Sequence, residues 1–155
     1  PKLFIRNNKT MKENNIIALR CSKDAGKTNT IKLLSQLLQE KYPHTILLDY
    51  YPDTPYDIKL IIEIGKIKIG IESQGDPNSR LCKSLEEFVQ KKCDIIVCAT
   101  RTRGQTVECV ESYSHSYNIK FVDKHKEFDK NKQDESNSKY AKKLLGYISD
   151  IIQSY

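Results

Sequence analysis

Two kinds of hydrophobic pattern alternate along the chain and predict alternating strands and helices. Short apolar runs are typical of buried strands, and they fall at residues 16–19, 45–49, 93–99 and 119–122. Between them, apolar residues recur every three or four positions, which is typical of amphipathic helices. These helices are expected at about 28–42, 77–92, 105–113 and 138–155.

A β-hairpin is predicted ahead of the second of these helices. Residues 58–64 and 66–72 are rich in isoleucine, alternate with polar positions and flank Gly65. The next helix is expected to begin with Asp76 as its N-cap and Pro77 in its first turn. Strands that alternate with helices favour a mostly parallel sheet with helices on both faces. The expected fold class is therefore a three-layer α/β/α fold with one antiparallel hairpin.

A single domain accounts for most of the 155 residues, which are enough to bury a sizeable core. Residues 1–15 are polar and rich in asparagine and lysine, so we expect a polar N-terminal arm ahead of one domain at 16–155. Residues 123–137 are densely charged and are expected to form a linker or surface loop. The C-terminal helix is expected at 138–155.

Composition favours a soluble globular protein. Hydrophobic residues make up 38% of the chain and charged residues 30%, and no apolar stretch approaches the roughly 20 residues of a membrane span. The N-terminal residues lack the long apolar segment of a signal peptide. We therefore expect a cytoplasmic protein that does not bind membranes.

The cysteines and histidines carry no metal-binding pattern. No C-x-x-C pair occurs, and four of the five cysteines lie inside apolar runs, so they are expected to be reduced and buried. The three histidines do not have zinc-ligand spacing, and no structural metal is expected. The cysteines are Cys21, Cys82, Cys93, Cys98 and Cys109.

The net charge of +6 is compatible with anionic partners such as nucleotides. The basic residues are scattered among acidic ones and form no dense block with aromatic residues. Nucleic acid is therefore not the expected partner. A protein partner and the oligomeric state are left open.

The octet Cys21–Thr28 carries the most specific chemical signal. It fits the phosphate-binding pattern G-x-x-x-x-G-K-[ST], except that Cys21 takes the place of the first glycine. A predicted strand precedes it and a predicted helix follows, so backbone N–H groups and the positive end of the helix converge on one point. Lys27 at a helix start is electrostatically unfavourable unless an anion lies there too. The alternative is an ordinary lysine after a turn glycine.

With its flanking strand and helix, this octet resembles the phosphate-binding loop of the P-loop nucleoside triphosphate hydrolase superfamily. The resemblance implies that Lys27 contacts the β- and γ-phosphates and that Thr28 coordinates Mg²⁺. It covers residues 16–122 as architecture and implies a P-loop NTPase-like fold with ATP and Mg²⁺ as cofactors. The binding residues expected on this basis are Lys23, Asp24, Ala25, Gly26, Lys27, Thr28 and Asn29.

The resemblance also implies a strand-end carboxylate that serves Mg²⁺, and two residues qualify. Asp49 ends an apolar run, and Asp49–Asp53 is similar to an acidic segment of the ParA/MinD-like branch. Glu72 ends the second hairpin strand, and Glu72–Gly75 is similar to the D-x-x-G switch of GTPases. Alternatively, each acid is a solvated strand end. No N-K-x-D guanine-reading motif directly follows the strand at 93–99, which favours ATP over GTP; the N-K-x-D tetrad that the chain does contain, Asn131–Asp134, lies in the charged segment 123–137.

Arg101 and Arg103 follow another strand and are expected at the same edge of the sheet, where they would neutralise a transferring phosphate. Gln74 would orient an attacking water; otherwise all three are exposed loop residues. The first functional hypothesis is a Mg²⁺-dependent NTPase or a small phosphotransferase similar to nucleotide kinases. The second is a nucleotide-sensing interaction module that binds ATP with little or no turnover. The candidate catalytic residues are Lys27, Asp49, Arg101 and Arg103.

Overall fold

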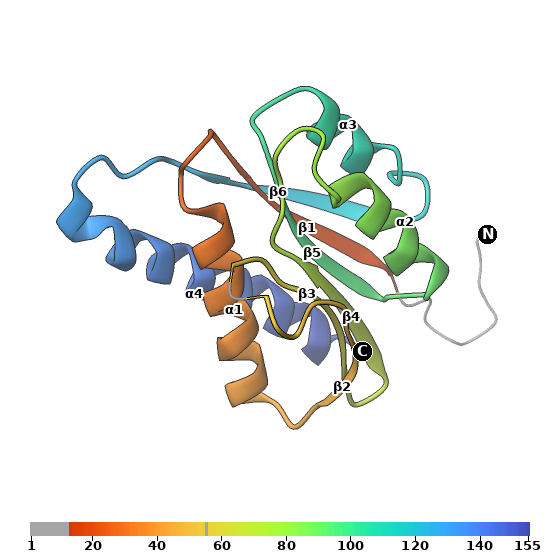
Figure 1. The fold of residues 1–155 in the computed structure, drawn as a ribbon. Coiled ribbons are helices and arrows are strands. Elements are labelled where there is room, and N and C mark those ends of the chain that lie inside the picture. The colour runs from red at the N-terminus through yellow and green to blue at the C-terminus, as the bar shows by residue number, and fades with distance from the viewer. Residues whose placement is uncertain (1–12, 55) are drawn as a thin grey trace.

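A six-stranded sheet with helices on both faces forms the protein (Figure 1). The computed structural model describes residues 13–54 and 56–155. The strands are β1 (Asn15–Cys21), β2 (Thr45–Asp49), β3 (Lys59–Ile64), β4 (Ile67–Glu72), β5 (Ile95–Thr100) and β6 (Asn118–Lys124). The helices are α1 (Lys27–Lys41), α2 (Leu81–Gln90), α3 (Gln105–Glu111) and α4 (Gln133–Gln153), with a 3₁₀ turn at Lys130–Lys132.

The strand order is β2-β3-β4-β5-β1-β6, and most of the pairs are parallel. β1 runs parallel to both β5 and β6, and β4 runs parallel to β5. β3 runs antiparallel to both of its neighbours, and it turns into β4 at Gly65, whose φ is 61°. The predicted α/β class and the predicted hairpin are therefore confirmed.

Each face of the sheet has its own apolar core. On one face, α1 and α4 cover the sheet with residues such as Leu34 and Leu144. On the other, α2 and α3 do so with residues such as Phe88 and Val110. Gly70 in β4 is required for this packing, because a Cβ atom there would lie 2.7 Å from the Phe88 ring. The two cores fix the sheet as the middle one of three layers.

Strand β2 is exposed, although its apolar sequence predicts a buried strand. Ile46 is 48% exposed, Leu47 40% and Leu48 38%. β2 occupies the outer position of the described sheet, beyond the antiparallel β3, and all five of its residues are exposed. The prediction of a buried strand is wrong because an apolar run indicates a strand but does not indicate whether that strand lies at the centre or at the edge of the sheet.

Two predicted boundaries also differ from the structure. α2 begins at Leu81 and not at Pro77, and its N-cap position is Arg80, so Asp76 does not cap it. Much of the segment 123–137 is regular structure, because β6 extends to Lys124 and α4 begins at Gln133. Of the predicted N-terminal arm, residues 1–12 lie outside the described residues.

Two cysteines form a disulfide, which corrects the expectation that all five are reduced. The bond joins Cys82 in α2 to Cys109 in α3, with Cα atoms 5.6 Å apart. Cys21, Cys93 and Cys98 are free and buried, as expected. Burial raises the pKa of the Cys21 thiol to about 11 and that of Cys93 to about 12, so both are poor nucleophiles.

No helix in the described part of the chain has the length and apolar character needed to cross a membrane. Among the same residues, no three histidine, cysteine or acidic side chains gather as a group that could hold a metal ion.

Candidate functional site

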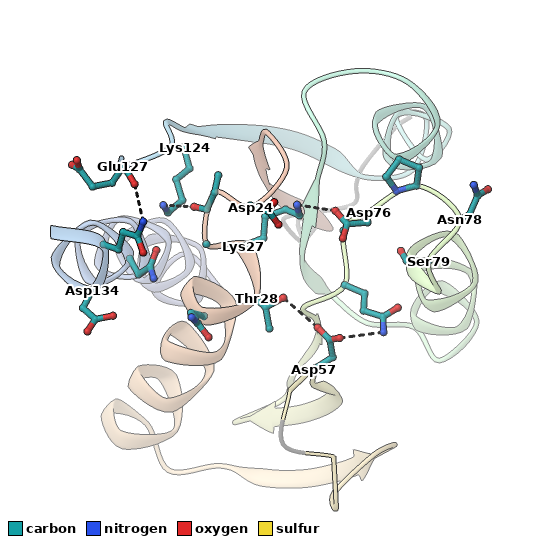
Figure 2. Close-up of a pocket in the computed structure, with 18 residues that line it drawn as sticks. Asp24, Lys27, Thr28, Asp57, Asp76, Asn78, Ser79, Lys124, Glu127 and Asp134 are labelled. Carbon is teal, nitrogen blue, oxygen red and sulfur yellow. Dashed lines mark hydrogen bonds and ion pairs between the residues drawn. The ribbon is translucent and has the colours of Figure 1, made fainter. Parts of the chain in front are cut away.

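A cavity of about 680 Å³ opens where the loops after β1 and β4 meet the start of α1 and the start of α4 (Figure 2). The carboxyl ends of parallel strands are the usual ligand site in α/β sheets. The cavity described above is lined by Asp24–Asn29, Asp57, Gln74–Ser79, Lys124, Glu127, Gln133, Asp134 and Asn137.

The segment between β1 and α1 forms a tight turn into the helix. Asp24 and Gly26 both have positive φ, at 58° and 85°. A Cβ atom at Gly26 would lie 2.4 Å from Oδ1 of Asn137, so another residue here would displace the Asn137 side chain and strain the left-handed backbone. Gly26 is the N-cap residue of α1 and offers no side-chain cap, and the first turn of the helix holds no acidic residue. Among the residues that the structure describes, no side chain caps the first N–H groups of α1.

The Lys27 side chain is 7% exposed and points into the cavity, where it meets a carboxylate. Its Nζ lies 2.9 Å from Oδ1 of Asp76, and Nε of Arg101 lies 3.0 Å from the same oxygen. Burial by itself raises the pKa of Asp76, but hydrogen bonds and charge from Lys27 and Arg101 outweigh it and leave the pKa below its usual value. Asp76 is therefore ionised at neutral pH and supplies the negative charge beside Lys27.

Thr28 contacts Asp57, a carboxylate that the sequence analysis did not single out. Thr28 Oγ1 donates to Asp57 Oδ1 at 3.3 Å (Figure 2). Ser73 Oγ donates to the same oxygen at 2.9 Å, and Gln74 Nε2 donates to Oδ2 at 3.3 Å. Asp57 lies just before the antiparallel β3, so no apolar run ending in an acid marked it.

The two acids expected to serve Mg²⁺ lie elsewhere. Asp49 ends the exposed edge strand opposite Leu60 and does not line the cavity. Glu72 is completely buried, and both of its oxygens are engaged. Oε1 accepts hydrogen bonds from Arg80 Nε at 2.8 Å and Ser84 Oγ at 2.5 Å, and Oε2 accepts one from Gln74 N at 3.0 Å.

Of the other expected site residues, most line the cavity and two lie outside it. Asp24, Ala25, Gly26, Lys27, Thr28 and Asn29 line the cavity together with Gln74, and Arg101 reaches its edge through Asp76. Lys23 and Arg103 are exposed and lie outside its walls.

Lys124 is a further cation at the site that the sequence analysis missed. It is 4% exposed, and its Nζ donates to the backbone oxygen of Ala25 at 2.5 Å. Burial lowers the pKa of the Lys124 ammonium. The apolar pattern of β6 stops at Val122, so Lys124 fell in the segment expected to be a loop. Its role in the structure is to hold the turn that precedes α1.

An anion bound at Lys27 would compete with Asp76, so we expect replacement of Asp76 by asparagine to raise the affinity for inorganic pyrophosphate severalfold, up to about tenfold. The lowered pKa keeps the carboxylate charged across neutral pH, so the gain should be constant between about pH 6 and 8. Isothermal titration calorimetry measures both effects. Asp150→Asn on the exposed side of α4 is the matched control. An unchanged or weaker affinity in Asp76→Asn would contradict the competition.

Comparison of the chain with protein-family models, with curated proteins and with solved structures gives no significant match. The functional interpretation therefore rests on the geometry of this cavity.

Proposed function

We propose that the chain binds ATP with Mg²⁺ through Asp24–Asn29 and acts as a Mg²⁺-dependent NTPase or small phosphotransferase. The observation that supports this most directly is the convergence of an uncapped helix start, a left-handed Gly26 and the buried Lys27 ammonium on one cavity. Unpaired N–H groups at a helix N-terminus favour an anion. The volume of about 680 Å³ falls in the range typical of small-molecule sites.

The ion pair between Lys27 and Asp76 also favours an anionic ligand. A buried ammonium is costly unless an opposite charge accompanies it. Asp76 provides that charge from a loop, and its side chain is 57% exposed. A phosphate oxygen would make the same contact with Lys27 and would also accept from the first N–H groups of α1, with which Asp76 forms no hydrogen bond in the described part of the chain.

Thr28 and Asp57 are the residues that fit Mg²⁺. They place a hydroxyl and a carboxylate oxygen 3.3 Å apart at the cavity wall. Mg²⁺ prefers oxygen ligands and is commonly held by one or two carboxylates together with substrate phosphates. Bound there, the metal would neutralise phosphate charge. Ser73 and Gln74 orient Asp57 by donating to its oxygens.

We expect Asp57→Asn to weaken the apparent affinity of the protein–ATP complex for Mg²⁺ by about tenfold, because an amide oxygen carries no charge for the metal. A magnesium titration monitored by binding of a non-hydrolysable ATP analogue measures it. Asp49→Asn is the matched control and should leave the affinity unchanged, since Asp49 lies outside the cavity. The opposite ranking of the two variants would restore Asp49 as the metal ligand.

Arg101 is the residue best placed to assist phosphoryl transfer. It already lies 3.0 Å from the carboxylate that pairs with Lys27, so a phosphate in that place would meet both cations. Transfer of a phosphoryl group depends mainly on positioning and charge neutralisation. Arg103, which is exposed and outside the cavity, has no such position.

The second candidate function, an ATP-binding module with little turnover, is favoured by Glu72. Both of its oxygens are already occupied by Arg80, Ser84 and Gln74, so it is not free to activate a water. Phosphate release by the wild-type protein, compared with Lys27→Ala, separates the two functions. If the wild-type protein binds MgATP but releases phosphate no faster than Lys27→Ala, the protein is an ATP-binding module and not an NTPase. If it does not bind MgATP at all, both candidate functions are excluded.

A further inference from the structure

We propose that two copies of this chain associate through β2, edge to edge and antiparallel, so that one sheet continues across both copies. This inference does not depend on nucleotide binding. It rests on the exposed apolar residues of β2, on the open edge of this strand, and on the charges at its two ends.

Exposed hydrophobic side chains concentrate on β2 and the residues that follow it. Across the described residues, six large hydrophobic side chains are exposed, and five of them belong to the segment 46–56. These residues are close in the sequence, and grouped exposed apolar residues mark an interaction site more often than scattered single residues do. The five are Ile46, Leu47, Leu48, Tyr51 and Tyr56; the sixth is Phe128.

The backbone edge of β2 is open as well. Within the described sheet, β2 pairs only with β3, so its outer side has no neighbouring strand. Leu47 has no register partner in β3, because the pairing shifts between Ile46 and Leu48. Edge strands are usually protected from pairing by charged residues, proline, bulges or short length, and of these β2 has the register shift but no proline or charge at its centre. The opposite edge, β6, carries Lys120, Asp123 and Lys124, whereas the centre of β2 carries only Ile46, Leu47 and Leu48.

Charge at the two ends of the strand selects a second copy as the partner. Lys41 and His44 precede β2, and Asp49 and Asp53 lie at its end and beyond. Lys41 contacts the Ser149 hydroxyl at 3.0 Å and the Tyr42 ring, and it forms no ion pair with any of the described residues. In antiparallel self-pairing, the basic end of each copy faces the acidic end of the other. Parallel pairing would bring like charges together. The segment is thus complementary to itself in one orientation.

The size of the surface sets the expected strength. β2 has five residues, an ordinary length for a strand, so it offers a small surface compared with the roughly 1,600 Å² that a stable interface typically buries. We therefore expect a dimer that dissociates in the micromolar range.

Sedimentation velocity on the full chain, from about 1 to 500 µM, tests the proposal by showing whether monomer converts to dimer as concentration rises. Leu47→Lys should raise the dissociation constant at least about tenfold. Phe128→Lys is the matched control, because Phe128 is 82% exposed and lies outside the segment, and it should change nothing. A monomer at every concentration, a species larger than a dimer, or equal effects of the two variants would overturn the proposal.

Charge-reversal variants distinguish antiparallel self-pairing from nonspecific hydrophobic association. Asp49→Lys and His44→Glu should each weaken the dimer, and the double variant should recover most of the wild-type affinity. Failure of the double variant to recover would reject antiparallel self-pairing. Hydrogen exchange on the wild-type protein gives a readout that needs no variant: backbone N–H groups in 45–49 should exchange more slowly at high concentration than at low. Unchanged exchange there would reject β2 as the interface.

Discussion

Replacing Lys27 with alanine is expected to lower the affinity for MgATP by about 100- to 1,000-fold. The Lys27 ammonium is buried at the cavity wall, and its charge-assisted bonds to phosphate would have no replacement. The fold should persist, because Asp76 keeps its ion pair with Arg101. Isothermal titration calorimetry with a non-hydrolysable ATP analogue and Mg²⁺ measures the affinity, and thermal unfolding checks the fold.

Lys23→Ala is the matched control for this experiment. Lys23 lies in the same loop, but it is exposed and does not line the cavity. Lys23→Ala should change the affinity for MgATP by about twofold at most, because an exposed charge contributes little to binding. If the two lysine variants bind MgATP equally well, the phosphate site is not at Lys27.

The second large effect is expected at Glu72, on stability. Glu72→Gln should lower the free energy of unfolding by about 3 kcal/mol, because it leaves the partly buried Arg80 cation without its counter-charge. In the wild-type protein, Gln74 N donates to one carboxylate oxygen of Glu72 and Arg80 Nε donates to the other. The substitution replaces one of these two acceptors with an NH₂ group, so one of the two donors loses its hydrogen bond. Chemical denaturation measures the change.

Glu86→Gln, on the exposed side of α2, is the control and should be within about 0.5 kcal/mol of wild type. A Glu72→Gln protein as stable as wild type, with weakened Mg²⁺ binding, would contradict the structural role and return Glu72 to the metal site.

Local pattern was sufficient for the elements that pack in the usual way. The hairpin at Gly65 was predictable because two alternating isoleucine-rich runs flank a residue that accepts positive φ. The turn before α1 was predictable as far as Gly26 and Lys27, because the chemistry of that loop lies within one octet. These features depend on neighbours in sequence.

The residues that were missed depend on neighbours in space. Asp57 meets Thr28 across 29 positions, and Lys124 meets Ala25 across 99. Neither pairing leaves a mark in local sequence. The strand order likewise places β3 between β2 and β4, which removes Asp49 from the cavity and exposes Ile46–Leu48. Hydrophobic pattern identified these strands but could not arrange them.

The Cys82–Cys109 bond follows the same rule, since the two residues are 27 positions apart and come together only when α2 packs beside α3. Asp76 was noticed in the sequence, but as a helix cap. Its pairing with Lys27 requires the loop after β4 to approach the start of α1.

The position of Asn137 means that the turn before α1 is not self-contained. This α4 residue accepts a hydrogen bond from Thr30 Oγ1 at 3.2 Å and fills the space where Gly26 has no side chain. A protein shortened before residue 133 would lose that support, so its loop could relax even though every residue of the octet remained. Loss of function after C-terminal truncation would therefore resemble the effect of a mutation within the octet. A point substitution at Asn137 distinguishes the two causes, because it removes the support and leaves the rest of α4 in place.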